Sequence, residues 1–88
     1  MKRKQNCILR RIGGRELILP IEGEMIQTDA IFILEGIGTF LWEQLASECT
    51  RQTLLKAVLS EYDVDKETAG EDLDEFIKNA KDVGIIEN

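Results

Sequence analysis

The stretch Asn6-Cys-Ile-Leu-Arg-Arg-Ile-Gly-Gly-Arg-Glu-Leu-Ile-Leu-Pro-Ile21 decides the fold class, because a pair of glycines joins two short apolar runs. Both central positions of a type I′ hairpin turn need a positive φ angle, which glycine adopts without strain. The pattern predicts one strand from Asn6 to Ile12 and a returning strand from Glu16 to Ile21. Pro20 lacks a backbone N–H, so we expect it at the end of its strand or on an edge.

Further along the chain, one more strand and three helices are predicted. After a polar connection around residues 22–24, the β-branched and aromatic run Ala30-Ile-Phe-Ile-Leu34 predicts a third strand. From residue 35 the apolar period becomes helical: a first helix runs to about Cys49, a second covers residues 52–62, and a third covers residues 65–83. The order predicts an α+β fold, a three-stranded antiparallel meander followed by a three-helix bundle, of winged helix-turn-helix type.

Residues at the predicted helix ends support these boundaries. Thr50 is suited to cap the second helix, and Asp65 is suited to cap the third. Gly84 is suited to end the third helix. The apolar pair Ile85-Ile86 is then expected to close the chain against the core.

Composition favours one small domain over residues 1–88. The chain has 88 residues, a net charge of −6 and 43% hydrophobic residues, and no apolar run approaches the roughly 20 residues that a spanning helix needs. We therefore expect a cytoplasmic protein. Two distant cysteines, Cys7 and Cys49, are expected as small unpaired side chains of the core.

Charge is distributed unevenly. Residues 1–15 hold six Lys or Arg and no acid, whereas residues 65–75 hold six acids and one Lys. In a winged-helix DNA-binding domain residues 65–75 would begin the recognition helix, and their charge opposes contact with phosphates. DNA binding therefore remains a weaker alternative, as does another kind of protein-interaction domain.

Side chains suited to catalysis are scarce. The chain has no His, so Ser47 and Ser60 have no imidazole to activate them, and two cysteines are too few for a zinc motif. The Gly36-Ile-Gly38 segment lacks the third Gly and the Lys of a phosphate loop, so it is interpreted as a strand-to-helix turn. We expect a protein that is not an enzyme and holds no metal or cofactor.

Four segments together resemble one family over essentially the whole chain: Leu34-Glu-Gly-Ile-Gly-Thr-Phe-Leu-Trp-Glu-Gln-Leu45, Leu59-Ser-Glu-Tyr-Asp-Val-Asp65, Asp72-Leu-Asp-Glu-Phe-Ile77 and Val83-Gly-Ile-Ile-Glu87. Their order and spacing are similar to those of the pyrroloquinoline-quinone synthesis protein D (PqqD)-like family. This fold is shared by the recognition elements of ribosomally made, post-translationally modified peptides. One departure is that Glu35-Gly36 stands where the family has Asn-Glu.

The resemblance implies a peptide-binding partner protein. Such proteins bind the leader segment of a precursor peptide and present it to a modifying enzyme, often a radical S-adenosylmethionine enzyme. The leader pairs with the edge of the third strand and lies beside the third helix. Carried onto this chain, the implied peptide-binding residues are Ala30, Ile31, Phe32, Ile33, Leu34, Thr68, Asp72, Glu75, Phe76 and Asn79. Monomer and homodimer both fit the sequence.

The third predicted strand has physical properties that suit strand addition. Residues 30–34 are apolar and contain no Pro or charge, so apart from shortness they lack the usual protection of an exposed edge. An added peptide would gain affinity from ladder hydrogen bonds and selectivity from pockets for alternate side chains. An interior strand with both edges paired is the alternative.

Overall fold

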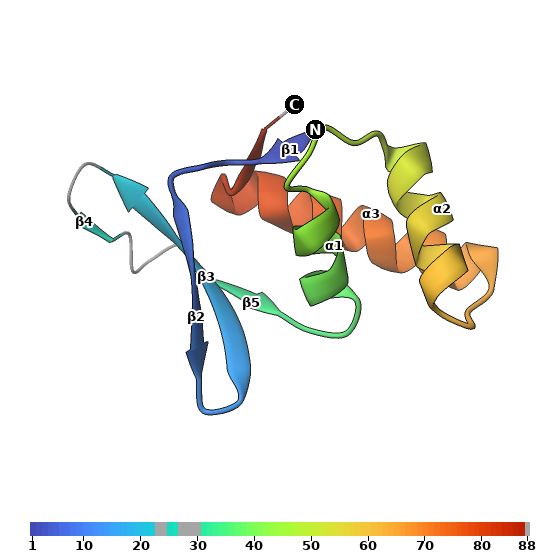
Figure 1. Ribbon diagram of the computed structural model, residues 1–88, viewed down its shortest axis with the longest axis horizontal. Coiled ribbons are helices and arrows are strands. Elements are labelled where there is room, and N and C mark those ends of the chain that lie inside the picture. Colours follow the sequence, from blue (N-terminus) through green and yellow to red (C-terminus); the bar gives the residue numbers. More distant parts are fainter. Residues whose placement is uncertain (23–24, 27–30, 88) are drawn as a thin grey trace.

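The computed structural model describes residues 1–22, 25–26 and 31–87, and it confirms the expected α+β class. Most strands gather on one side of the molecule and the helices on the other, while the two short strands at the chain ends lie beside the helices (Figure 1). The elements in chain order are β1 (Lys2–Arg3), β2 (Cys7–Ile12), β3 (Arg15–Glu22), β4 (Met25–Ile26), β5 (Phe32–Leu34), α1 (Gly38–Gln44), α2 (Arg51–Glu61), α3 (Lys66–Val83) and β6 (Ile86–Glu87).

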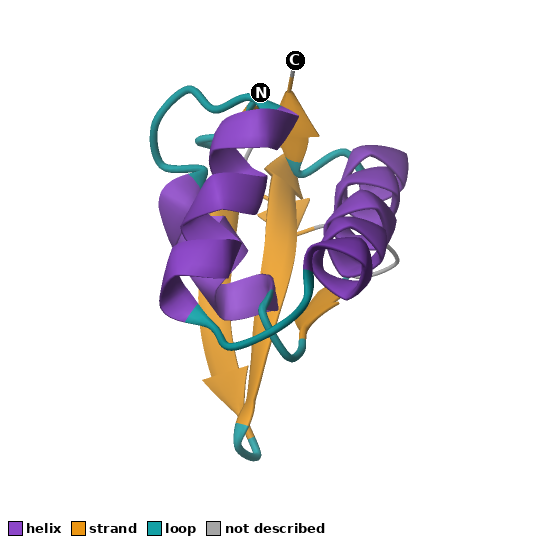
Figure 2. Ribbon diagram, turned by 90° about the vertical axis from the view of Figure 1, so that its right-hand side faces the viewer, coloured by secondary structure: helices purple, strands orange, loops and turns teal. Residues whose placement is uncertain are grey.

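The β2–β3 hairpin forms as predicted. Gly13 and Gly14 have φ angles of 59° and 79°, as a type I′ turn requires. Ile12 pairs with Arg15 directly beside the turn, and the ladder continues to the far end of β2. The two strands run past the helices, so the end of the hairpin projects from the body of the molecule (Figures 1 and 2).

On its other side, β3 pairs antiparallel with both β5 and β4. Phe32 of β5 lies opposite Ile18, and Ile26 of β4 lies opposite Ile21. The predicted antiparallel pairing of three strands is therefore confirmed, within a sheet of four. β4 was not predicted, because its two residues follow a stretch that looked like a polar connection. β5 is shorter than predicted: it begins at Phe32, and residue 30 lies outside the described residues.

The prediction for Pro20 was wrong, because this residue lies inside β3 opposite Cys7. The Ile21 N–H donates to the Asn6 carbonyl at 2.7 Å, so odd-numbered residues of β3 direct their backbone groups toward β2. Pro20 therefore turns its nitrogen the other way, between the positions paired with β5 and those paired with β4. Among the described residues, none is paired with Pro20 on that side, so its missing N–H leaves every described ladder pair intact.

One apolar core lies between the sheet and the helices. Ile18 from β3 and Leu73 from α3 are both fully buried, and Trp42 of α1 is 6% exposed. Cys7 and Cys49 are unpaired, as expected, but they are only partly buried at the margin of the core. The other buried apolar residues are Leu34, Leu41, Leu45, Leu54, Leu55, Val58, Ala69, Phe76, Ala80, Ile85 and Ile86.

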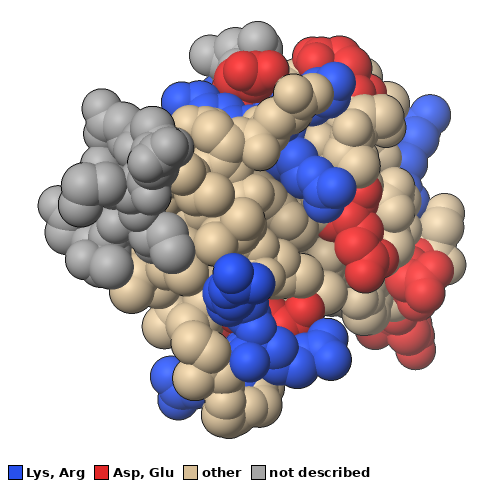
Figure 3. Space-filling view, turned by 60° about the vertical axis from the view of Figure 1, so that its left-hand side comes forward, with Lys and Arg blue, Asp and Glu red and all other residues tan. Residues whose placement is uncertain are grey.

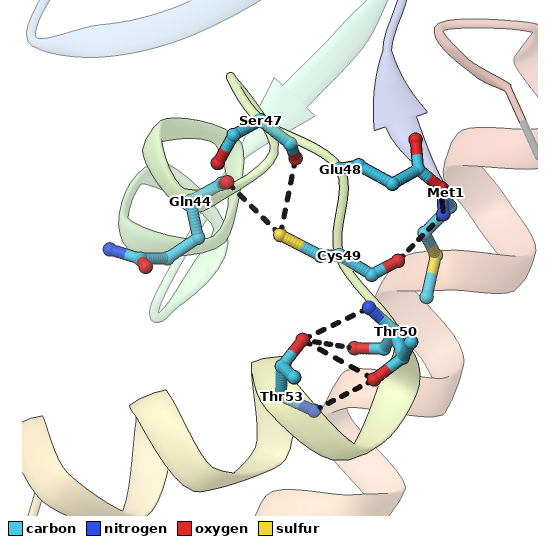
Figure 4. Close-up of polar contacts among 7 residues, drawn as sticks. All are labelled: Met1, Gln44, Ser47, Glu48, Cys49, Thr50 and Thr53. Atoms are coloured by element: carbon cyan, nitrogen blue, oxygen red, sulfur yellow. Dashed lines mark hydrogen bonds and ion pairs between the residues drawn. The ribbon is translucent and has the colours of Figure 1, made fainter.

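The helix caps follow the sequence, whereas the end of α1 does not. Thr50 and Thr53 form a reciprocal capping box at the start of α2 (Figure 4). α1 ends at Gln44 rather than near Cys49, whose S–H donates to the carbonyl oxygens of Gln44 and of Ser47 in the α1–α2 connection (Figure 4). Asp65 accepts a bond from the Thr68 amide at 2.7 Å.

A small sheet that was not predicted joins the two ends of the chain. Arg3 of β1 pairs with Ile86 of β6, and the Lys4 N–H donates to the Ile85 carbonyl at 2.9 Å. The Arg3 N–H also donates to the Leu45 carbonyl at 2.9 Å, which ties β1 to the end of α1. Ile85 is fully buried, as its predicted position against the core requires.

Across the described parts of the chain, no helix has the length and apolar character needed to cross a membrane.

Candidate functional site

The outer edge of β5 is open in the described part of the chain. Ile18 and Phe32 face each other, and the alternation in β3 makes theirs a hydrogen-bonded pair. The backbone N–H and C=O of Ile33 must then point away from β3. Within residues 1–22, 25–26 and 31–87, no strand pairs with this edge.

A groove of about 320 Å³ lies beside this edge. Its apolar part includes two rings in edge-to-face contact, Phe32 from β5 and Phe76 from α3, with centroids 5.5 Å apart and planes at 83°. Phe76 is only 9% exposed, so it is held by the core and cannot swing freely. The full lining is Phe32, Ile33, Glu35, Gly36, Ile37, Gly38, Asp72, Glu75, Phe76 and Asn79.

The rim of the groove carries negative charge. Asp72 and Glu75 are exposed residues of α3 and Glu35 precedes α1, and no Lys or Arg lines the groove among the described residues. None of these three carboxylates forms an ion pair within the described residues. A nearby acid behaves differently: hydrogen bonding to Arg51 lowers the pKa of Asp74, which lies outside the groove.

The loop at one end of the groove is the strand-to-helix turn that the sequence predicts for residues 36–38. Gly36 has a φ angle of +56°, which lets the chain turn sharply from β5 into α1. A Cβ on Gly38 would lie 3.5 Å from Leu34 and 3.7 Å from Phe76, so glycine leaves these side chains room to pack. The interpretation of Gly36-Ile-Gly38 as a turn is therefore confirmed, whereas the sequence did not predict that this turn lines the groove.

The structure brings six of the ten predicted peptide-binding residues to the groove: Phe32, Ile33, Asp72, Glu75, Phe76 and Asn79. Ile31 lies just before β5 and is 44% exposed. Leu34 does not line the groove, because its side chain is buried in the core. Thr68 is exposed near the start of α3, away from the groove, and residue 30 lies outside the described residues.

A larger hollow of about 520 Å³ lies between β2, α1 and residues 2–5. The Arg3 guanidinium lies 5.5 Å from the centre of the Trp42 ring, and its Nη1 donates to the Trp42 carbonyl at 3.2 Å. Arg3 thus serves to hold β1 against α1. β2 is the other edge strand of the sheet and contributes Cys7 and Leu9 to this hollow, so the difference from the groove is one of charge: Lys2, Arg3 and Lys4 line the hollow, whereas no Lys or Arg lines the groove among the described residues.

Metal chemistry has no evident place in the described structure. Across residues 1–22, 25–26 and 31–87, no three His, Cys, Asp or Glu side chains converge in a way that could hold an ion.

Comparisons with known proteins bear on both the sequence and the fold. The family model described as coenzyme PQQ synthesis protein D (PqqD) matches residues 17–86. Among solved structures, TbiB1 in complex with the TbiA(beta) leader peptide is similar, with a TM-score of 0.75 and 22% sequence identity. The similarity covers 100% of this chain and 96% of that one. No curated protein matches.

Proposed function

This chain belongs to the coenzyme PQQ synthesis protein D family, and we propose that it binds the leader segment of a precursor peptide for presentation to a modifying enzyme. The proposed leader adds as a strand to the outer edge of β5 and lies against α3. A radical S-adenosylmethionine enzyme is the receiving class that the family resemblance suggests. The chain itself acts as a non-catalytic partner.

One observation carries this proposal: an open strand edge borders a groove with an aromatic floor. Ile33 directs its backbone groups outward, and Phe32 with Phe76 provides apolar surface directly beside them. Strand addition needs both features, a row of unpaired backbone groups and a pocket for alternate side chains. TbiB1, which has a similar fold, was solved in complex with a leader peptide, and this supports leader binding as the function proposed for the present chain.

The energetics show what the peptide must contribute. Ile31 and Ile33 offer two N–H and two C=O groups to an added strand, worth roughly 0.5–1.5 kcal/mol each, or about 2–6 kcal/mol together. Micromolar binding needs about 8 kcal/mol. One apolar side chain buried over Phe32 and Phe76 would add about 1.5–3 kcal/mol. The proposed ligand therefore carries at least one large apolar residue.

The carboxylates on the rim indicate the charge of the ligand. Asp72, Glu75 and Glu35 favour a peptide with Lys or Arg next to its apolar anchor. The same charges oppose the DNA-binding alternative, because exposed acids along α3 would repel phosphates.

Amide-resolved NMR titration with peptides encoded beside this gene tests the proposal. We expect saturable shifts concentrated on residues 31–36 and 72–79. The matched control is the same peptide with its apolar anchor replaced by Ser, which should bind at least tenfold more weakly. Shifts confined to residues 1–15, or saturable binding of duplex DNA at physiological salt, would refute the proposed site.

A further inference from the structure

The sheet has a second face that the helices do not cover. Ile18 points into the core, so alternation along β3 places Leu17 and Leu19 on the opposite face. Their cross-strand neighbours there include Ile33 of β5 and Ile8 of β2. We call the set Ile8, Arg10, Ile12, Arg15, Leu17, Leu19 and Ile33 the outer face.

The outer face is apolar and accessible. Ile12 is 60% exposed and Ile33 is 41% exposed, while Ile8, Leu17 and Leu19 are partly buried. The helices α1, α2 and α3 lie on the other side of the sheet (Figure 1). Exposed branched aliphatic side chains gathered on one strand face are typical of a surface that meets another macromolecule.

The charge of the outer face is opposite to that of the molecule as a whole. Arg10 and Arg15 are exposed on it, and no described residue of the face is acidic, although the chain carries −6 overall. The nearest hairpin carboxylate, Glu16, alternates to the helix side, where it accepts a bond from Thr39 at 3.0 Å. Figure 3 shows Lys and Arg gathered beside a largely uncharged surface.

We propose that the outer face docks the modifying enzyme, through an apolar surface of that enzyme bordered by Asp or Glu. This inference rests on the proposed function. A second copy of the chain is a poor occupant, because an interface of two outer faces would contain four arginines and no carboxylate from either face. An enzyme surface with acidic margins satisfies both the aliphatic side chains and the two guanidinium groups.

Continuity of the sheet strengthens the assignment. A leader peptide added to β5 becomes the next strand of the same sheet, so alternate side chains of the peptide extend the outer face beyond Ile33. An enzyme seated on Leu17 and Ile33 would touch the bound peptide without displacing it. Recognition of the peptide and delivery to the enzyme then use the edge and the outer face of one sheet.

The test measures two affinities for each variant: for the purified modifying enzyme encoded beside this chain, and for its leader peptide. Arg10→Glu and Ile12→Asp should each weaken enzyme binding about tenfold and change leader binding less than twofold. Lys56→Glu makes the same charge change as Arg10→Glu on an exposed position of α2 and should alter neither affinity. Arg10 is exposed, so its variant should keep the wild-type unfolding midpoint.

Three outcomes would overturn the inference. If Arg10→Glu and Lys56→Glu weaken enzyme binding equally, the outer face is not the docking site. A concentration-dependent dimer that Arg10→Glu dissociates would assign the face to a second copy, and binding to anionic vesicles in place of the enzyme would assign it to a membrane. Failure of leader binding alone, with enzyme docking still sensitive to Arg10, would refute the proposed function and leave this surface standing.

Discussion

Replacing Ile33 by Pro tests whether the edge of β5 receives a peptide strand. The register places the N–H of Ile33 on the side of β5 that faces away from β3, so the substitution removes no bond of the sheet. Phe32 precedes the new proline and already has the extended conformation that proline imposes on its neighbour. The fold should therefore survive, with an unfolding free energy lowered by less than about 1.5 kcal/mol.

The expected loss of peptide affinity follows from two effects. Removal of one ladder donor costs roughly 0.5–1.5 kcal/mol. The proline ring also occupies the space into which the carbonyl of the added strand must come. About 1.4 kcal/mol corresponds to tenfold in affinity, so we expect the dissociation constant to rise at least tenfold.

Calorimetric titration of the leader peptide measures this loss, with urea unfolding as the check on the fold. Ile33→Val keeps the N–H and should bind within twofold of the wild type. Phe32→Pro provides the contrast, because its N–H faces β3 and its ring packs on Phe76; it should lower the unfolding free energy by about 3 kcal/mol or more. A folded Ile33→Pro variant with unchanged affinity would refute strand addition at β5.

Three further outcomes are expected. Trp42→Ala should lower the unfolding free energy by about 3–5 kcal/mol in urea titrations, because the ring is 6% exposed; a change below about 1 kcal/mol would contradict its place in the core. Hydrogen bonds to a backbone amide and to a guanidinium lower the pKa of Asp65 and Asp74, respectively, below the ordinary 3.8. Their contribution to stability should be complete above pH 3.8 and decline as the pH falls through the folded-state pKa values; urea midpoints that stay constant from pH 5 to pH 2 would disagree. Asp72→Asn combined with Glu75→Gln should weaken the binding of a Lys- or Arg-bearing leader about three- to tenfold at low salt and should flatten the salt dependence of binding. An unchanged salt slope would show that the basic residues of the leader contact another part of the protein.

The sequence predicted those element boundaries well that depend only on neighbouring residues. Gly13 and Gly14 require a turn, and Thr50 and Asp65 satisfy the first amides of their helices, so these boundaries could be identified from neighbouring residues alone. The end of α1 was placed too late, because Cys49 continued the apolar spacing although the helix ends at Gln44.

Non-local pairing escaped prediction for a physical reason. β1, β4 and β6 have two residues each, too few to show alternation, and their pairing depends on segments brought near by the rest of the fold. Pro20 is a related case: among the described residues it lies between the β3 positions paired with β5 and those paired with β4, an arrangement that depends on long-range pairing.

The groove was predictable in its residue types but not in its limits. The family resemblance implied Asp72, Phe76 and Asn79, which the structure brings to the groove, and it also implied Thr68, which lies too near the start of α3 to line the groove. Alternation along a strand buries Leu34 and turns Ile33 outward, and this choice depends on the register with β3, which the sequence alone does not set.

The pairing of β1 with β6 also has a consequence for the order of folding. It joins positions 2–3 to positions 86–87, whereas the β2–β3 hairpin closes over two glycines. Each doubling of loop length adds about 0.6 kcal/mol to the entropic cost of closure. Closing the loop between β1 and β6 therefore costs roughly 3 kcal/mol more than closing the β2–β3 hairpin. We expect the β1–β6 pair to form last and open first, with the Lys4 amide exchanging its hydrogen ahead of the amides in the β2–β3 ladder. A chain whose ends have come apart would still keep β5 and α3 together, and with them the groove.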